Sequence, residues 1–438
     1  MALVSPAREC AYAVVRRVFE EGAYADRAFN AEAAGLEPRE RAFAMALAYG
    51  TVQRRATLDH VAAQLSSRPL AKLDPPLLVA LRLGLMQLLL LDGVAEHAAV
   101  HESVELAKRH GRGGAGLVNA VLRRATREGR AILDQLDDRT PAGAAILHSV
   151  PVWLAELWWR ELGPGPAREL LRRINDPAES AMRVNTLVAS PAQVIDELAV
   201  AAHPAPDLPE GLVLEGPFDA YASELWARGA IMPQSRGSML VTRVLAPGPG
   251  ERVLDLCAAP GAKTTQMAAL MGDQGTLMAV EHHPGRAAAL QRTIERMQVR
   301  CATVEVADAA APAPAATPPG PGYDRVLVDP PCSGLGTLQS RPDLRWRTSP
   351  ERIADLAPLQ ARILRAGAAA TRAGGTLVYS VCTISRAESE DVVDRFLGEH
   401  DEFEAEDLSA AGDDGPYLRL LPHREGTDGF FIARLHRR

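Results

Sequence analysis

The chain has 438 residues, enough for two or three domains with substantial cores. Hydrophobic residues at 47%, charged residues at 24% and no apolar run long enough to span a bilayer predict a soluble protein without a membrane partner. The net charge of −7 argues weakly against nucleic acid. Five cysteines with no C-x-x-C pair argue against a disulfide framework and a metal site, and predict a cytoplasmic protein.

The first 130 residues show helical periodicity almost throughout. Ala11, Val14, Val15 and Val18 recur at helical spacing, and the run from Leu77 to Leu91 is apolar nearly all round, which predicts the central helix of a bundle. Residues 1–140 carry 19 Lys and Arg against 17 Asp and Glu, so this part is slightly basic in an acidic chain. A locally basic surface can bind phosphates despite an acidic total.

A basic stretch follows between residues 108 and 130. Two interpretations stay open for it, a solvated helical face or an RNA-contacting patch. Its cations are Lys108, Arg109, Arg112, Arg123, Arg124, Arg127 and Arg130.

The next stretch, to about residue 220, connects two halves. SAMRVNTL, from Ser180 to Leu187, predicts a strand in which Arg183 and Asn185 are polar where an apolar residue would fit, and we expect both to contact RNA. Residues 203–216 are rich in proline and predict a loop.

From Gly248 onward predicted strands alternate with helices, the signature of a doubly wound, mostly parallel sheet. The first strand, Arg252 to Leu256, runs into CAAPGAKTTQ, a turn and helix start that point backbone N–H groups at a ligand. This is neither a Walker A loop nor a G-x-G-x-x-G motif. Residues 309–322 form an Ala/Pro/Gly tract that predicts a surface loop.

Acids follow three later strands in succession. Thr276 to Val280 ends in Glu281, Thr303 to Val306 ends near Asp308, and a third apolar run ends in Asp329. A single acid at a strand end is usually a turn residue, but three in a row suit ribose hydroxyls, an adenine amino group and further cofactor contacts. The layout predicts a nucleoside with a carboxylate-bearing tail, S-adenosyl-L-methionine.

Two cysteines occupy equivalent places at strand ends. Cys332 follows the strand that ends at Val328, and Cys382 follows the run Leu377 to Tyr379. If these strands are neighbours, about 4.8 Å apart, both thiols face one crevice.

Several motifs carry a family resemblance. GAGLVNAVLRR, from Gly114 to Arg124, resembles the NusB-type RNA-binding helical domain. CAAPGAKT, DPPCSGLG, RPDLRW, YSVCTI and DGFFIARL are similar to successive motifs of RNA cytosine-5 methyltransferases. Together they resemble the Fmu/RsmB (Sun) group, which modifies small-subunit ribosomal RNA.

The resemblance implies a fold and a division of the chain. The expected fold is an α/β Rossmann-like methyltransferase domain over residues 221–438. It is preceded by an all-α NusB-like domain over residues 1–135 and a small linking helical or α+β subdomain over residues 136–220.

The resemblance also implies roles for individual residues. Cys382 would be the nucleophile, Cys332 would assist release, and Asp329 and Lys263 would complete the catalytic set. The cofactor would be held by Cys257, Ala258, Ala259, Pro260, Gly261, Ala262, Lys263, Glu281, Asp308 and Asp329. In RPDLRW, we expect Arg345 and Trp346 to contact RNA, with packing of Trp346 as the competing interpretation.

Two positions depart from the family pattern. Ala262 replaces the usual second glycine of the cofactor loop, which matters only if that residue needs a positive φ. MPQSRGSML, from Met232 to Leu240, lacks the usual Gln-Asp pair, so no role is carried onto Ser235.

The predicted reaction forms 5-methylcytosine in RNA by addition of a cysteine thiolate to carbon 6 of the base, and the resemblance implies small-subunit (16S) ribosomal RNA as the substrate. Transfer RNA is an alternative substrate. An amino-group methyltransferase could also use Asp-Pro-Pro, although such sites have no use for Cys382, and an inactive ribosome assembly factor is the alternative outside enzymes. We expect the protein to act as a monomer.

Overall fold

The computed structural model describes residues 4–311, 322–409 and 415–438, and the chain forms two compact units. The first comprises the chain up to Asp176 together with Leu338–Ser349, and the second comprises Pro177–Thr337 and Pro350–Arg438. The predicted linking region, residues 136–220, is therefore divided between the two units. Among the described residues, no helix has the length and apolar character needed to cross a membrane.

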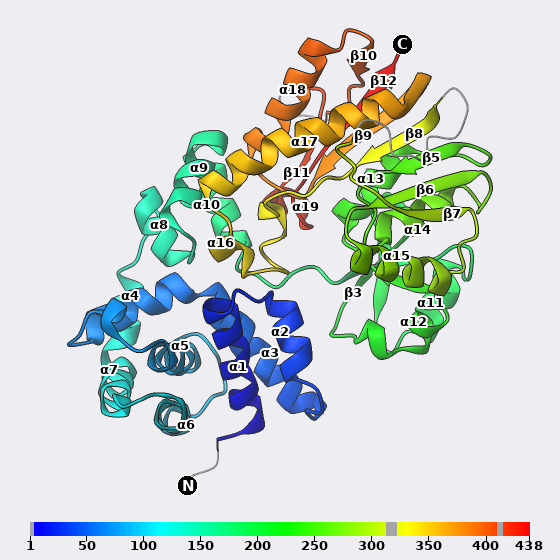
Figure 1. The fold of residues 1–438 in the computed structure, drawn as a ribbon. Coiled ribbons are helices and arrows are strands. Elements are labelled where there is room, and N and C mark those ends of the chain that lie inside the picture. The colour runs from blue at the N-terminus through cyan, green and yellow to red at the C-terminus, as the bar shows by residue number, and fades with distance from the viewer. Residues whose placement is uncertain (1–3, 312–321, 410–414) are drawn as a thin grey trace. The chain divides into compact units, whose positions relative to one another are not determined.

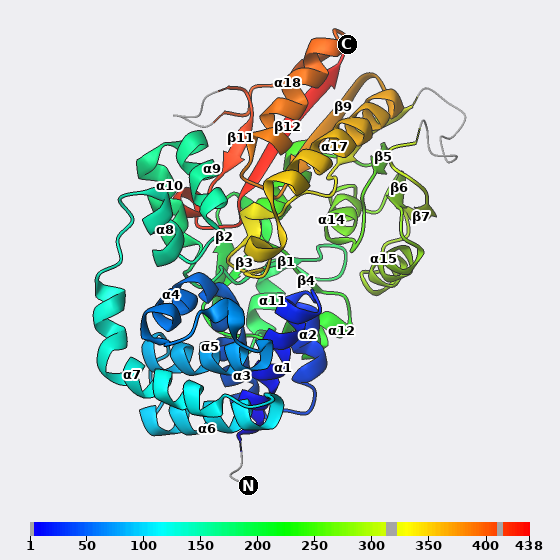
Figure 2. The same ribbon diagram turned by 60° about the vertical axis from the view of Figure 1, so that its left-hand side comes forward.

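The first unit is helical, as predicted. Its helices are α1 (Pro6–Glu20), α2 (Ala25–Glu32), α3 (Pro38–Gln53), α4 (Arg55–Leu65), η1 (Leu70–Lys72), α5 (Pro75–Leu89), α6 (Glu96–His110), α7 (Ala115–Asp134), α8 (Pro141–Leu147), α9 (Val152–Leu162), α10 (Pro164–Arg173) and α16 (Leu344–Arg347). The apolar helix α5 packs against α1, α3, α4, α6 and α7 (Figure 2). Leu81, Leu83 and Leu85 are fully buried, which confirms α5 as the centre of the bundle.

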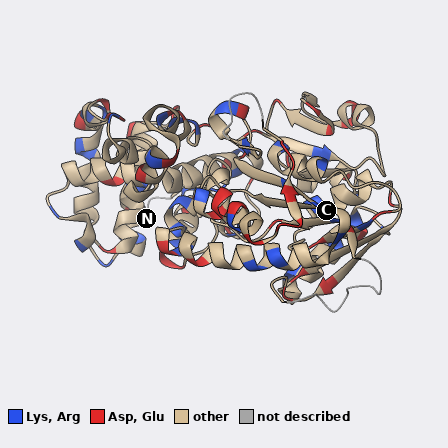
Figure 3. Cartoon of the chain, turned by 90° about the horizontal axis from the view of Figure 1, so that it is seen from above, with Lys and Arg blue, Asp and Glu red and all other residues tan. Residues whose placement is uncertain are grey.

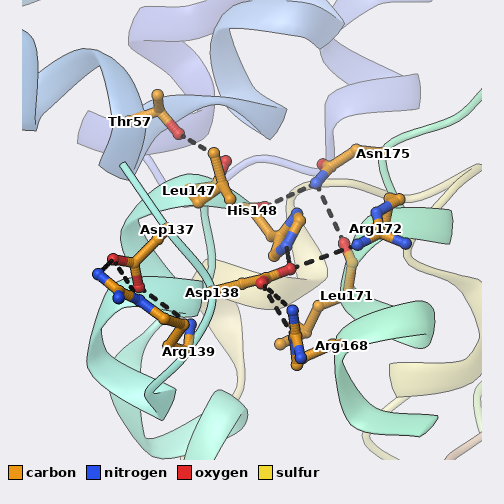
Figure 4. A network of polar contacts seen from close by, with 10 residues as sticks. All are labelled: Thr57, Asp137, Asp138, Arg139, Leu147, His148, Arg168, Leu171, Arg172 and Asn175. Atoms are coloured by element: carbon orange, nitrogen blue, oxygen red, sulfur yellow. Dashed lines mark hydrogen bonds and ion pairs between the residues drawn. The ribbon is translucent and has the colours of Figure 1, made fainter. Parts of the chain in front are cut away.

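A buried carboxylate joins the helices that lie beyond residue 135 in this unit (Figure 4). Asp138 Oδ1 lies 2.7 Å from Arg168 Nη2, and its Oδ2 lies 3.2 Å from His148 Nε2 and 3.5 Å from Arg172 Nη2. Burial lowers the pKa of His148 against the opposing effect of Asp138. Asn175 Nδ2 donates to the His148 carbonyl, so α8 and α10 are held to one another.

The second unit begins with a small antiparallel sheet in the order β2-β3-β1-β4. Its elements are β1 (Ala181–Val184), α11 (Pro191–Glu197), β2 (Ala202–Ala205), β3 (Leu208–Leu214), η2 (Ala220–Ala222), α12 (Glu224–Ala227) and β4 (Ile231–Pro233). The loop predicted at residues 203–216 is wrong, because β2 and β3 form a hairpin there. Pro204 is tolerated because β2 is the edge strand, and Asp207 takes a left-handed φ of 58° at the turn.

The main sheet of the second unit has the order β10-β12-β9-β8-β5-β6-β7, with β11 paired to β12. Its strands are β5 (Arg252–Asp255), β6 (Thr276–Glu281), β7 (Ala302–Val306), β8 (Tyr323–Val328), β9 (Thr371–Val381), β10 (Phe403–Ala405), β11 (Leu418–Leu420) and β12 (Phe430–Arg437). Its helices are α13 (Arg236–Leu245), α14 (Ala262–Leu270), α15 (Pro284–Arg296), η3 (Leu335–Thr337), α17 (Pro350–Ala370), η4 (Arg386–Glu388), α18 (Glu390–Glu399) and α19 (Pro422–Glu425).

Strands β5 to β9 pair in parallel with one another, and β12 pairs with β9 in the antiparallel direction. Both faces of the sheet are covered, as Figure 1 shows for α17. Val326 and Leu377 pack in the cluster that includes α17 and α18, whereas Leu327 and Val378 pack in the cluster that includes α13, α14 and α15. This alternation explains why the strands are apolar in continuous runs.

The predicted doubly wound, mostly parallel sheet behind a helical first unit is thus confirmed. Of the loop predicted at residues 309–322, residues 312–321 lie outside the described residues.

Candidate active site

The carboxyl ends of the five parallel strands carry the candidate residues at one edge of the sheet. Following the strand order from β7 to β9, these are Asp308, Glu281, the loop 257–261, Asp329 and Cys382. The order of the strands reverses direction at β5 and β8, and a crevice at such a point is where open α/β sheets bind ligands.

The two thiols meet beside this point. Cys332 Sγ lies 3.4 Å from Cys382 Sγ, and neither residue forms a disulfide. This distance is well beyond the ~2.05 Å of a disulfide and corresponds to contact between a thiol and its neighbour. The expected proximity is confirmed, because β8 and β9 pair in parallel and Gly336 N donates to the Cys382 carbonyl at 3.0 Å. The contact with Cys382, together with burial, raises the pKa of the Cys332 thiol well above its ordinary value.

A half-buried ion pair lies next to the thiols. Lys263 Nζ donates to Asp329 Oδ2 at 2.7 Å, and Ser380 Oγ donates to Asp329 Oδ1 at 3.0 Å. Burial disfavours the ammonium of Lys263, but Asp329 outweighs it and raises the pKa of Lys263. Lys263 Nζ also lies 5.3 Å from the centroid of the Phe430 ring. Asp329 is thereby held in one orientation by a cation and a hydroxyl.

The loop after β5 contains a required glycine at Gly261, not at position 262. Gly261 has φ of 106°, and a Cβ atom there would lie 2.8 Å from Leu290 Cδ1. Ala262 is the first residue of α14 and is not among the positive-φ residues of the described chain. The alanine at this position is therefore compatible with the loop.

Behind this loop lies the buried carboxyl group of Asp255. Thr264 Oγ1 donates to Asp255 Oδ2 at 2.7 Å, while burial raises the pKa of Asp255 to about 7. The same burial raises the pKa of the Cys257 thiol well above its ordinary value, so Cys257 is not a thiolate at neutral pH.

Glu281 is positioned by the backbone that follows β6. It is 4% exposed, and its Oε1 accepts from His283 N at 2.9 Å. Arg286 Nη2 lies 3.4 Å from Glu281 Oε2 and donates to the Ala259 carbonyl at 2.8 Å, which ties the carboxylate to the loop after β5. An oriented carboxylate at the end of this strand fits ribose hydroxyls. Asp308 is exposed and accepts from Ala310 N at 2.9 Å.

The RNA contacts predicted for Arg183 and Asn185 are wrong, because both side chains are fully buried. Arg183 donates to Gln234 Oε1 at 2.9 Å and to Thr265 Oγ1 at 2.8 Å, and burial lowers its pKa to about 9. Asn185 donates to the carbonyls of Gly229 and Met297. Arg183 in β1 and Asn185 just after this strand thus brace the start of α14 and the end of α15 instead of facing solvent.

The RNA contact predicted for Arg345 is also wrong, and Trp346 packs inside the first unit. Arg345 is fully buried, and its guanidinium donates to the Ser149 carbonyl and to Asn175 Oδ1, both at 3.1 Å. Trp346 is half-buried, donates to the Val52 carbonyl at 2.7 Å and has the Arg55 guanidinium 5.0 Å from its ring centroid. The segment Leu338–Ser349 is thus an internal part of the helical unit.

The basic stretch at residues 108–130 is largely neutralised by neighbouring acids. Lys108 pairs with Glu105 and Arg124 with Glu128. Figure 3 shows the same pattern more widely, with basic and acidic residues interspersed along the helices. These pairs favour the solvated-face interpretation for the pairing residues.

Sequence reasoning missed two positions next to the thiols. Ser380 lies in β9 and holds Asp329, and Glu388 lies in η4 and accepts hydrogen bonds from both cysteine loops. A signal for Glu388 existed, an acid six residues after Cys382 in VCTISRAESE, but helix-start acids of this kind are common.

Three family models match the chain. The model described as 16S rRNA methyltransferase RsmB/F matches residues 242–436, and the NusB family model matches residues 5–127. A ferredoxin-like domain of RsmF/B-like methyltransferases matches residues 150–221.

Curated relatives match nearly the whole chain. A probable ribosomal RNA small subunit methyltransferase B of Synechocystis is 38% identical, with 98% of this chain and 99% of the relative covered. The ribosomal RNA small subunit methyltransferase B of Thermus thermophilus is 36% identical, with 91% and 89% covered.

Two solved structures match this chain over nearly the whole of their own length. The protein PH0851 superposes with a TM-score of 0.83 at 27% identity and covers 99% of both chains. NSun6 from Pyrococcus horikoshii, solved with SFG, gives a TM-score of 0.60 at 25% identity and covers 66% of this chain and 99% of its own.

Proposed function

Because the chain belongs to the RsmB/F family of 16S rRNA methyltransferases, we propose that it transfers a methyl group from S-adenosyl-L-methionine to carbon 5 of a cytosine in small-subunit ribosomal RNA. The observation that carries the cytosine-5 chemistry is the pair of thiols 3.4 Å apart, with Asp329 at the end of the strand that precedes Cys332.

The residues at the strand ends fit S-adenosyl-L-methionine. Glu281 offers an oriented carboxylate for the ribose, and the loop 257–261 leads into α14 with its backbone N–H groups facing outward along the helix axis. A family neighbour solved with SFG is consistent with this assignment. When bound, S-adenosyl-L-methionine supplies an electrophilic methyl group.

The two thiols can overcome the low reactivity of carbon 5 of cytosine. Carbon 5 of cytosine is a poor nucleophile until a thiolate adds to carbon 6. Cys382 is the attacking group, and Asp329 lies where a carboxyl can assist at N3 of the base. After carbon 5 is methylated, the carbon-5 proton must be removed and the sulfur expelled. Cys332, in contact with Cys382, takes part in that release.

Lys263 serves Asp329 in this scheme. Its ammonium keeps the Asp329 carboxylate aimed at one side of the crevice, and its charge also stabilises a nearby thiolate of Cys382. The target base has to leave its stack to reach this crevice, which is least costly in single-stranded or looped RNA.

The experiment separates the two thiols by what each variant traps. Cys382→Ala should abolish methyl transfer, whereas Cys332→Ala should methylate the base and then stall with the RNA covalently bound to Cys382. Incubation with 16S ribosomal RNA and S-adenosyl-L-methionine should therefore give a slow protein–RNA band on a denaturing gel for Cys332→Ala only. Bisulfite mapping of the RNA identifies the modified cytosine.

Cys301→Ala is the matched control. Cys301 directly precedes β7, so it lies at the amino end of a strand, away from the carboxyl ends that carry the site, and it has no role in the scheme. A band with Cys382→Ala instead would reverse the two roles. If both variants remain active and neither gives a band, covalent catalysis is excluded, and amino-group methylation through Asp-Pro-Pro becomes the better explanation.

A further inference from the structure

A buried carboxylate links the two loops that carry the thiols. Glu388 is 0% exposed and lies in η4, six residues after Cys382. It accepts hydrogen bonds from the residue that follows each cysteine. Ser333 N donates to Glu388 Oε1 at 2.8 Å, and Ser333 Oγ and Thr383 Oγ1 both donate to Glu388 Oε2.

A helix on the face of the sheet joins the same carboxylate. Gln360 of α17 donates two hydrogen bonds through its side-chain amide. Its Nε2 lies 3.0 Å from Glu388 Oε1 and 3.0 Å from the Pro331 carbonyl oxygen. Tyr379 of β9 donates its hydroxyl to the Glu388 carbonyl at 2.7 Å. Glu388 is therefore fixed from β9, from α17 and from both cysteine loops.

These donors are all neutral groups, and several of them converge on one carboxylate. A carboxylate accepts through two oxygens and never donates, so it can hold a backbone N–H, two hydroxyls and an amide at once. An apolar residue at this position would leave those buried donors unsatisfied.

We propose that Glu388 is a positioning residue that holds Cys332 and Cys382 at the separation needed for attack and release. This inference rests on the proposed covalent chemistry, in which Cys382 attacks the base and Cys332 then assists its release. A displacement of about 1 Å in such groups can cost on the order of 10²-fold in rate.

The test uses the full-length protein with Glu388→Gln and Glu388→Ala. Both should lower kcat, by on the order of 10²-fold for Glu388→Ala, with little change in KM for RNA. The matched control is Glu390→Gln, a second buried glutamate two residues away that pairs with Arg419 at 3.1 Å and does not touch Ser333 or Thr383 among its described contacts. It should behave like the unaltered protein.

A second readout requires no catalysis. Phenylarsine oxide condenses with two thiols, forming two As–S bonds and releasing one water, so its capture reports whether the thiols lie together. Capture should slow about tenfold or more in the Glu388 variants, because the effective concentration of one thiol at the other falls. Affinity for S-adenosyl-L-methionine by calorimetry should stay unchanged, which shows that the sheet is folded.

Equal capture rates and equal kcat for Glu388→Gln, Glu388→Ala and Glu390→Gln would overturn the proposal. So would a lower kcat with unchanged capture, because the thiols would then be held by something else. Failure of the cytosine chemistry is seen separately, as absence of the covalent RNA band in Cys332→Ala with Glu388 intact.

Discussion

At the scale of single residues, this site depends on two acids, Asp255 and Asp329, whose surroundings differ. Asp329 has a lysine ammonium and a serine hydroxyl as partners. Asp255 is buried, and its side-chain partner is the neutral hydroxyl of Thr264. Burial thus drives the Asp255 carboxyl toward its neutral form, one strand away from a carboxyl that is paired with a lysine.

The raised pKa of Asp255 predicts a pH dependence of stability. Burial raises it from an ordinary value of 3.8 to about 7, so the folded protein binds a proton that the unfolded chain releases between those values. This group therefore makes the free energy of unfolding fall as the pH rises from about 4 to about 7. Asp255→Asn should remove that part of the slope, as measured by urea unfolding at pH 5 and pH 8.

If Asp255→Asn shows the same loss of stability between pH 5 and pH 8 as the unaltered protein, Asp255 does not titrate in this range. Asp401→Asn, an exposed acid near β10, provides the control and should leave the slope unchanged.

Glu281 gives a second prediction at this scale. Glu281→Ala should weaken S-adenosyl-L-methionine binding by roughly 1.5–3 kcal/mol for each charged hydrogen bond lost to the ribose. Isothermal titration calorimetry measures the change. Glu295→Ala, an exposed glutamate of α15, should bind the cofactor normally, and an unchanged affinity in Glu281→Ala would remove Glu281 from the site.

At the scale of elements, the segment Leu338–Ser349 stands out because it lies only a few residues after Cys332 yet packs within the helical unit. Arg345 binds carbonyl groups near the ends of α3 and α10, at Gln53 and Ile174, and Arg347 binds the carbonyl of Gly22. Its arginines thus satisfy helix-end carbonyls that have no partner within their own helices.

Arg345→Ala should therefore destabilise the first unit. Several buried acceptors would lose a charged donor, at a cost of about 2–4 kcal/mol in the free energy of unfolding. Denaturant unfolding measures it, and the affinity for S-adenosyl-L-methionine should not change. Arg341→Ala, an exposed arginine of the same segment, is the control, and an equal effect of the two substitutions would contradict the structural role of Arg345.

At the scale of the whole molecule, we propose that the first unit supplies affinity for RNA and the second unit supplies the chemistry. A protein that lacks residues 1–176, with Leu338–Ser349 replaced by a short Gly/Ser linker, should still bind S-adenosyl-L-methionine. It should methylate RNA poorly, with a shallower salt dependence, because fewer phosphates are neutralised. Turnover measured over a range of KCl concentrations tests this.

Equal turnover and an equal salt slope for the truncated and the full-length protein would show that the helical unit adds nothing to RNA binding. A loss of cofactor binding in the truncated protein would instead show that the second unit does not fold alone.

The sequence alone determined the strands of the main sheet and the residues at their carboxyl ends. Continuous apolar runs mark strands buried on both faces, and parallel strands bring their ends to one edge, so Asp329, Cys332 and Cys382 could be placed together from their positions in the chain. The helical character of the first unit could also be predicted, because apolar residues at helical spacing lie on one face of a helix.

Only the tertiary structure decided what the polar residues between these motifs do. Arg183 and Arg345 carry the charge expected of RNA contacts, but both are buried against carbonyls and amides that come from distant parts of the chain. Glu388 is likewise an ordinary helix-start acid in sequence and becomes a link between two loops only when Ser333 and Thr383 converge on it. Charge can be read from the sequence, but burial depends on what packs opposite, and these two buried charges take their partners from the surrounding protein.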